Sequence, residues 1–140
     1  MSQENEISCY YACLKLITNY CWAFDQGETE RLVNVFSKNA SWTRPNGQTS
    51  IGHDAIRQSF LATPADVFFR HSIANFLIDH FNGSRAEGRS LVTVYNGPKP
   101  DSGLPKPAIP SAMVAYTDTF ELENGEWRIS CRKSERILAS

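Results

Sequence analysis

The apolar residues of this chain change their spacing once, and that change limits its fold more than any other feature. Up to residue 61 they recur every three or four positions, as in amphipathic helices. From residue 68 they alternate with other residues, as in half-buried strands. Helices followed by strands predict an α+β fold rather than an alternating α/β fold. A curved sheet wrapped around the first helix would leave a concave pocket of the kind that binds small ligands.

The helical part predicts three helices and one short strand. The first helix has an apolar stripe formed by Ile7, Tyr10, Tyr11, Leu14, Ile17, Cys21 and Phe24. Gly27 follows this helix, at a position where a left-handed cap is common. A second helix is expected at 28–37, and a third from residue 52 to just before Pro64. A short strand at 40–44, which contains Trp42, lies between them.

The remaining part predicts four long antiparallel strands, the first at 68–79. Alternation places one set of its residues on a single face: Phe69, His71, Ile73, Asn75, Leu77 and Asp79. An outward apolar set is expected on the opposite face of the first two strands: Phe76, Ile78, Leu91 and Tyr95. A two-residue turn at Asn82-Gly83 would place Val94 opposite His71, and a bulge would change such partners.

The other strands are expected at 84–96, 114–122 and 127–137. Asn124-Gly125 is predicted to form the turn between the last two. Residues 97–110 hold five of the seven prolines and show no periodicity, so they predict a long loop. A loop of this length in a compact domain is often a lid, a binding loop or an interface arm.

Length and composition narrow the class of protein. A chain of 140 residues is most simply one domain, here 1–140, and it can bury a core. Its net charge of −1 argues against a nucleic-acid partner. No apolar run approaches the ~18 residues that span a bilayer, so no membrane partner is expected. The polar, acidic start is unlike a signal peptide, which predicts a cytoplasmic location.

Four cysteines lie at positions 9, 13, 21 and 131. Zinc sites use closely paired cysteines with a second pair or histidines downstream, and this spacing does not match them. The cysteines are therefore interpreted as free thiols that pack as small apolar side chains. Neither a metal nor a cofactor is expected, because the chain also has no glycine-rich phosphate loop.

Asp25 and His71 are the candidate catalytic residues. Asp25 lies four residues after Cys21 and so extends the apolar stripe, whereas a solvated carboxylate would fall on the opposite helix face. A histidine is suited to removing a proton near neutral pH, and a buried carboxylate can orient its ring. The alternatives are a helix-end aspartate bonded to the next turn and a half-buried histidine without a chemical role.

These motifs, taken in order, resemble the NTF2-like superfamily and, within it, the SnoaL-like group. The resemblance rests on Phe24-Asp25-x-Gly27, Trp42, Gly52-x-x-Ala55-Ile56, Arg70-His71-x-x-x-Asn75 and Gly125-x-Trp127-x-Ile129. It covers nearly the whole chain and implies a cone-shaped α+β barrel with the pocket inside. This group contains scytalone dehydratase, lindane dehydrochlorinase and bile-acid 7α-dehydratase. It implies that an aspartate at the end of the first helix, here Asp25, holds a catalytic histidine, here His71.

The resemblance also implies substrate contacts for Tyr20 and Arg132. Tyr20, Phe24, Trp42, Phe69 and Asn75 are candidates for substrate binding, with packing or a polar tie within the sheet as the alternatives. For Arg132, alternation from the Asn124-Gly125 turn puts it on the face opposite Ile129, so both cannot point inward without a bulge. A surface position is therefore preferred for Arg132. Scytalone dehydratase has a second histidine on the next strand, where this chain has only Val92, Thr93 and Val94.

The leading hypothesis is a cofactor-independent lyase, such as a dehydratase, or an isomerase that acts on a small, largely apolar, cyclic molecule. The alternative from another class is a non-catalytic binding or assembly subunit, as in the β subunits of ring-hydroxylating dioxygenases. A further alternative is a ketosteroid-isomerase-like or polyketide cyclase-like enzyme; the isomerase needs an acidic base in the pocket. Asp25 is the carboxylate that could be placed in the pocket, and it is better explained as the partner of His71. A homo-oligomer, either a dimer or a trimer, is expected.

Overall fold

The computed structural model changes from helices to strands where the apolar spacing changes. It describes residues 3–106 and 110–139. The elements in chain order are α1 (Gln3–Gln26), α2 (Thr29–Asn34), β1 (Phe36–Thr43), β2 (Thr49–Ile51), α3 (His53–Leu61), β3 (Val67–Phe81), β4 (Arg85–Pro98), β5 (Ala112–Glu123) and β6 (Glu126–Ala139). The second helix is shorter than predicted, because the chain enters β1 at Phe36. The three-residue strand β2 was not predicted, since alternation cannot be read over so few residues.

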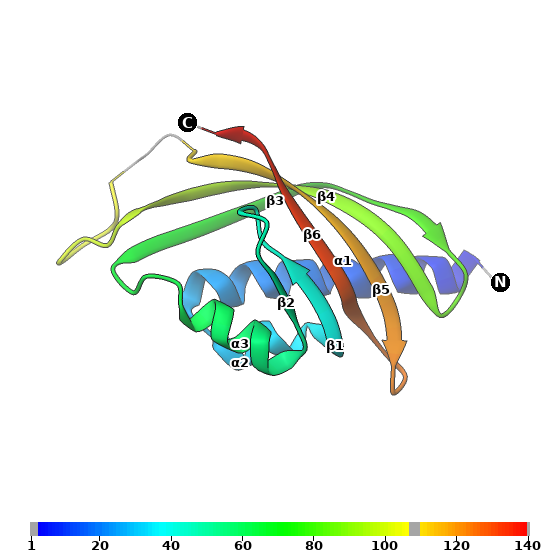
Figure 1. The fold of residues 1–140 in the computed structure, drawn as a ribbon. Coiled ribbons are helices and arrows are strands. Elements are labelled where there is room, and N and C mark those ends of the chain that lie inside the picture. The colour runs from blue at the N-terminus through cyan, green and yellow to red at the C-terminus, as the bar shows by residue number, and fades with distance from the viewer. Residues whose placement is uncertain (1–2, 107–109, 140) are drawn as a thin grey trace.

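The strands form one sheet in the order β2-β1-β6-β5-β4-β3. Neighbouring strands are antiparallel except for β1 and β6, which are parallel. Figure 1 shows the long strands arching over α1, with α2 and α3 beneath the β1–β2 end. Within the described residues the sheet stays open, with β2 and β3 at its edges, rather than closing into a barrel. The α+β fold with helices packed on a curved, mainly antiparallel sheet is confirmed.

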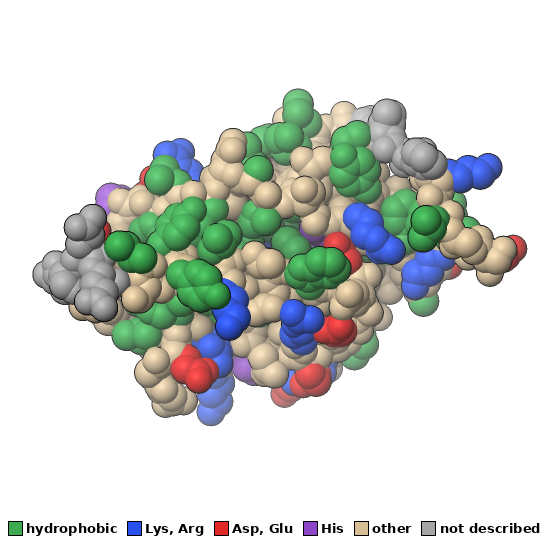
Figure 2. Space-filling view, turned by 180° about the vertical axis from the view of Figure 1, so that it is seen from behind, with side chains coloured by type: hydrophobic (Ala, Val, Ile, Leu, Met, Phe, Trp, Pro, Cys, Tyr) green, Lys and Arg blue, Asp and Glu red, His purple; other side chains and the backbone are tan. Residues whose placement is uncertain are grey.

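The buried face of α1 differs from the predicted stripe in its first half. Cys9, Cys13, Ile17, Tyr20 and Phe24 are buried, whereas Ile7 and Tyr11 are 62% and 67% exposed. Two stripes of similar spacing run along this helix, and the sheet covers the one with the smaller side chains. Figure 2 views the molecule from behind, and on that outer surface apolar side chains, in green, are interspersed with charged ones. The helix ends as predicted, with Gly27 at a φ of +70°.

A bulge at Asn75 changes the side-chain directions in the second half of β3. Asn75 has a φ of +55°, and the pairing with β4 shifts between Ala74 and Leu77. His71 pairs with Val94 as predicted, but beyond the bulge Phe76 and Ile78 pack on the core while Asn75 is exposed. The prediction that Asn75 and Leu77 share the His71 face is wrong, as is the outward placement of Phe76 and Ile78.

A second bulge reverses the predicted direction of Arg132. In the pairing of β5 with β6, Thr119 faces Cys131 and Phe120 faces Ile129, so Ser130 is an extra residue. Ile129 and Arg132 are consequently both fully buried, at 0% exposure each. The preferred surface position of Arg132 is therefore wrong, and the bulge that would allow both residues to point inward is present.

Of the two predicted tight turns, one is confirmed and the other is displaced by one residue. The turn at Asn124-Gly125 is confirmed, because both residues have a positive φ and Glu123 pairs with Glu126. The other turn lies one residue later than predicted, at Gly83–Ser84, because the backbone N–H of Asn82 donates to the backbone carbonyl of Arg85 at 3.0 Å. Strand β4 continues to Pro98, so the proline-rich loop is shorter at its start, and its residues 107–109 lie outside the described part.

The cysteines are free thiols, as predicted, and Cys9, Cys13 and Cys21 are buried. Cys131 is partly exposed. No helix in the described part of the chain has the length and apolar character needed to cross a bilayer.

Candidate functional site

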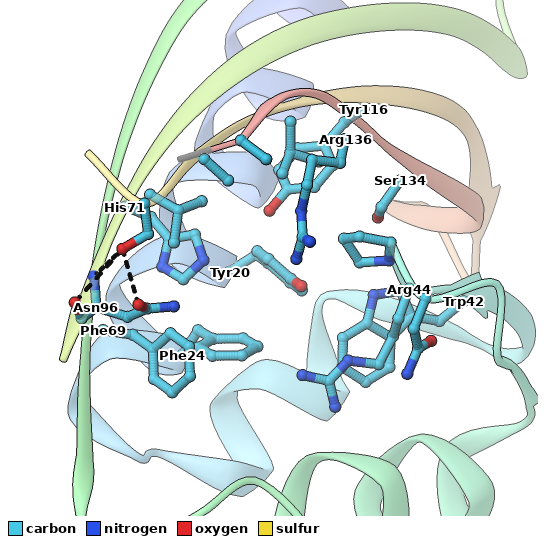
Figure 3. Close-up of a pocket in the computed structure, with 17 residues that line it drawn as sticks. Tyr20, Phe24, Trp42, Arg44, Phe69, His71, Asn96, Tyr116, Ser134 and Arg136 are labelled. Carbon is cyan, nitrogen blue, oxygen red and sulfur yellow. Dashed lines mark hydrogen bonds between the residues drawn. The ribbon is translucent and has the colours of Figure 1, made fainter. Parts of the chain in front are cut away.

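A cavity of about 410 Å³ opens on the concave side of the sheet, within the range of small-molecule sites. Figure 3 shows side chains entering it from α1, from β1 and from the long strands. Its lining comprises Tyr20, Phe24, Trp42, Arg44, Pro45, Asn46, Phe69, His71, Val94, Asn96, Ser111, Ala112, Val114, Tyr116, Ser134, Arg136 and Ala139. Aromatic and aliphatic side chains form about half of this wall, and polar side chains form the other half.

Asp25 and His71 meet in a two-point contact at this wall. The His71 ring nitrogen Nδ1 lies 2.5 Å from Asp25 Oδ1, and the backbone N–H of His71 donates to Asp25 Oδ2 at 2.8 Å. The side chains of His71 and Asp25 are 6% and 10% exposed. Because a carboxylate accepts hydrogen bonds, Nδ1 carries the proton toward Asp25 and Nε2 is the ring's free nitrogen. The last turn of α1 supplies Asp25 and the alternation of β3 supplies His71.

Aromatic rings surround the imidazole. The Phe24 ring lies edge-on to His71 with centroids 4.8 Å apart, and the Phe69 ring stacks at 6.4 Å. Figure 3 shows these three side chains together at one end of the cavity. This packing holds the ring in one orientation and reduces the access of water to it. Phe24 and Phe69 therefore lie beside the pair, and their contact with a substrate remains a prediction.

Tyr20 and Trp42 form the middle of the wall. Both are buried, at 3% and 1% exposure, and their rings meet edge-to-face with centroids 6.1 Å apart. In Figure 3 the phenol of Tyr20 extends from α1 toward the centre of the cavity. Burial raises the pKa of Tyr20 above its ordinary value, so the hydroxyl stays protonated and can donate a hydrogen bond.

Arg132 lies behind this wall and does not line the cavity. Its Nε and Nη2 atoms each donate to an oxygen of Asp118 at 2.7 Å, and its guanidinium lies 4.4 Å from the Tyr20 ring centroid and 3.9 Å from that of Tyr116. Burial alone would lower the pKa of Arg132, but the charge and hydrogen bonds of Asp118 outweigh it and raise the pKa. Arg132 thus packs against the rings of the two tyrosines from behind the cavity wall. The substrate contact that the resemblance implied for it is not seen at the lining.

The structure brings together Tyr20, Phe24, Trp42, Phe69 and His71 at one cavity, with Asp25 behind His71. Asn75 is absent from this lining because the β3 bulge turns it outward. Sequence reasoning missed several polar lining residues: Arg44, Asn96, Tyr116, Ser134 and Arg136. Alternation from Arg132 along β6 would have indicated Ser134 and Arg136 once its direction was known.

The buried thiols and phenols predict a loss of stability in alkaline solution. Burial raises the pKa of Cys21 to about 12 and that of Tyr116 well above its ordinary value. In the unfolded chain these groups ionise near pH 8.5 and pH 10. The stability that these groups contribute is therefore complete below those pH values. As pH rises toward the folded pKa, the free energy of unfolding falls by up to about 1.4 kcal/mol per pH unit for each group.

Urea unfolding between pH 8 and pH 11 measures this loss. Tyr116→Phe should flatten the fall in unfolding free energy above about pH 10, since one ionising group is removed. Tyr11→Phe, at a tyrosine that is 67% exposed, is the matched control and should leave the profile unchanged. Parallel profiles for wild type and Tyr116→Phe would contradict the prediction.

Comparison with known protein families finds one match to this chain. The sequence profile described as "SnoaL-like domain" matches residues 5–133. No curated protein matches the chain in sequence.

Three solved structures share the fold at low sequence identity. A scytalone dehydratase-like protein from Novosphingobium aromaticivorans has a TM-score of 0.84 and 17% identity, over 99% of this chain and 91% of that chain. A hexachlorocyclohexane dehydrochlorinase of the LinA type from Novosphingobium barchaimii has a TM-score of 0.81 and 15% identity, over 99% and 93%. An aromatic ring hydroxylase-like protein from N. aromaticivorans has a TM-score of 0.78 and 20% identity, over 94% and 91%.

Proposed function

The chain belongs to the SnoaL-like domain family of the NTF2-like superfamily, and we propose that it is a cofactor-independent lyase or isomerase. Its substrate would be a small, largely apolar, cyclic molecule that fits a cavity of about 410 Å³. The observation that supports this best is the hydrogen-bonded pair of Asp25 and His71 at the cavity wall. Dehydratase-like and dehydrochlorinase structures among those of the same fold favour elimination.

In the proposed reaction His71 Nε2 removes a proton from a carbon of the substrate. Asp25 fixes the ring tautomer through Nδ1 and stabilises the imidazolium that forms. In an elimination, the C–H electrons form a double bond as a neighbouring hydroxyl or halide leaves. In an isomerisation, His71 returns the proton to another carbon of the same molecule. The Tyr20 hydroxyl, kept neutral by burial, would donate to an oxygen of the substrate or of its leaving group.

A turnover assay tests this proposal. Alicyclic ketones and acids that carry a hydroxyl or chloride beside an acidic C–H are incubated with the protein, and products are identified by NMR in D₂O. Wild type should form the unsaturated product, and His71→Gln should lose about 10²–10⁴-fold in turnover because the base is gone. Incorporation of deuterium without loss of the leaving group would identify an isomerase. Equal turnover by wild type and His71→Gln would contradict the proposal.

A non-catalytic assembly subunit is the second candidate. Such a subunit would need an exposed apolar surface, to which side chains that stay exposed on the strands, such as Ile51, Leu77 and Leu138 at 69%, 48% and 63%, could contribute. We propose a homo-oligomer, a dimer or a trimer, and a cytoplasmic location. Light scattering during size exclusion gives the mass of the assembly. A stable complex with a larger partner chain, together with no turnover, would favour the assembly role over the enzyme.

A further inference from the structure

Two arginines of the cavity form no ion pair with a described carboxylate. Of the nine arginines, six form an ion pair with a described carboxylate. No described carboxylate pairs with the other three, and two of these, Arg44 and Arg136, line the cavity. Asp25, which contacts the lining residue His71, already accepts two hydrogen bonds from it. The lining itself therefore carries two guanidinium cations and no acidic side chain.

Arg44 is held in place before any ligand binds. Its Nη1 donates to the carbonyl of Ser59 at 3.1 Å, and its guanidinium lies over the ring of Trp42 at 4.9 Å and that of Phe24 at 5.7 Å. These contacts restrain the planar guanidinium against the aromatic wall and leave its other N–H groups available. A group restrained in this way loses less conformational entropy when it binds a ligand.

Arg136 reaches the cavity from the opposite side. It lies on β6 facing Val114 of β5, two residues after Ser134, and alternation puts both residues on the concave face. Figure 3 shows its guanidinium extending into the cavity toward Tyr20. Arg136 is exposed overall, so it stands at the cavity mouth, whereas Arg44 is half-buried.

An arginine that faces an aromatic cavity is stabilised most by an anion that accepts from its planar fork of donors. The Asp25–His71 pair occupies one end of the same cavity, and the rings of Phe24 and Phe69 lie beside it. We propose that the substrate is a cyclic carboxylic acid whose carboxylate is bound by Arg44 and Arg136 while its ring contacts His71. This inference rests on the proposed function, because it names the substrate class of that site.

Calorimetric titration of the full chain with 2-naphthoate and its neutral counterpart 2-naphthamide tests the inference. Wild type should bind 2-naphthoate at least about tenfold more tightly, the factor that one charge-assisted hydrogen bond supplies. Arg44→Met and Arg136→Met should each lose about tenfold for 2-naphthoate and little for 2-naphthamide. The amide titration shows whether a variant has lost the cavity itself. Lys133→Met removes a charge from an exposed position of the same strand and should change neither affinity.

Binding is measured without turnover, so this test can fail separately from the proposed function. His71→Gln should keep the preference for 2-naphthoate, even if no elimination activity is found. Loss of the preference in His71→Gln would assign the anion to the imidazolium and overturn the inference. Equal affinity for the two probes, unmeasurable binding of 2-naphthoate, or an equal loss in Lys133→Met would also overturn it. Tighter binding of 2-naphthyl phosphate than of 2-naphthoate would overturn the choice of a carboxylate.

Discussion

Asp25→Asn should reduce turnover by about 10²–10⁴-fold while the protein stays folded. Asp25 accepts two hydrogen bonds from His71, one from the backbone N–H and one from Nδ1. An asparagine has a single acceptor oxygen, so when that oxygen takes the backbone N–H, its amide group donates to Nδ1. The proton of the neutral ring then moves to Nε2, and the nitrogen that faces the substrate can no longer act as a base.

A matched variant separates this effect from a general loss of charge. Asp54→Asn makes the same chemical change at a side chain that is 96% exposed, and its turnover should equal that of wild type. Circular dichroism and the melting temperature confirm that each variant is folded. Turnover by Asp25→Asn within a few-fold of the Asp54→Asn value would show that the carboxylate does not orient the histidine.

Asp118→Asn should lower the free energy of unfolding by about 3–5 kcal/mol, because it leaves a buried guanidinium without its counter-charge. Arg132 and Asp118 are 0% and 1% exposed, and both oxygens of Asp118 accept from the guanidinium at 2.7 Å. Nη1 of Arg132 already lacks a hydrogen-bond partner among the described residues. Urea unfolding at pH 7 measures the loss.

Two comparisons define the cause of that loss. Glu126→Gln breaks the ion pair of Arg128 at the protein surface and should cost less than about 1 kcal/mol. The double variant Asp118→Leu with Arg132→Met removes both charges and should recover much of the stability that Asp118→Asn loses. If Asp118→Asn and Glu126→Gln unfold at the same urea concentration as wild type, the buried pair does not stabilise the fold.

Local patterns were sufficient to predict the α+β fold and the meeting of Asp25 with His71. Asp25 follows the α1 stripe by one helical turn, and His71 precedes the β3 bulge, so simple periodicity held for both. Asn75 lies at the bulge itself, and its direction depends on pairing with β4. A Cβ at Gly88 of β4 would stand 2.7 Å from the Leu77 carbonyl, so glycine is needed where the bulged strand comes close.

The position of Arg132 could not be predicted for the same reason. A single extra residue at Ser130 turns every later side chain of β6 to the other face. Arg136 was missed because of this bulge. Arg44 lies two residues after Trp42 in the predicted strand 40–44, so alternation would have put both on one face, but Arg44 was not considered as a candidate. The choice between two similar stripes on α1 likewise depended on which one the sheet covers, a tertiary property.

The tautomer of His71 is the most direct test of the proposed acid–base pair of Asp25 and His71. Long-range proton–nitrogen correlation spectra of ¹⁵N-labelled protein distinguish the two nitrogens of each neutral histidine ring, and comparison with His71→Gln assigns the His71 signals. We expect a protonated Nδ1, bonded to Asp25, and an unprotonated Nε2 available as the base. Asp25→Asn should reverse this assignment. An Nε2–H tautomer in the wild-type protein would contradict the proposed acid–base pair.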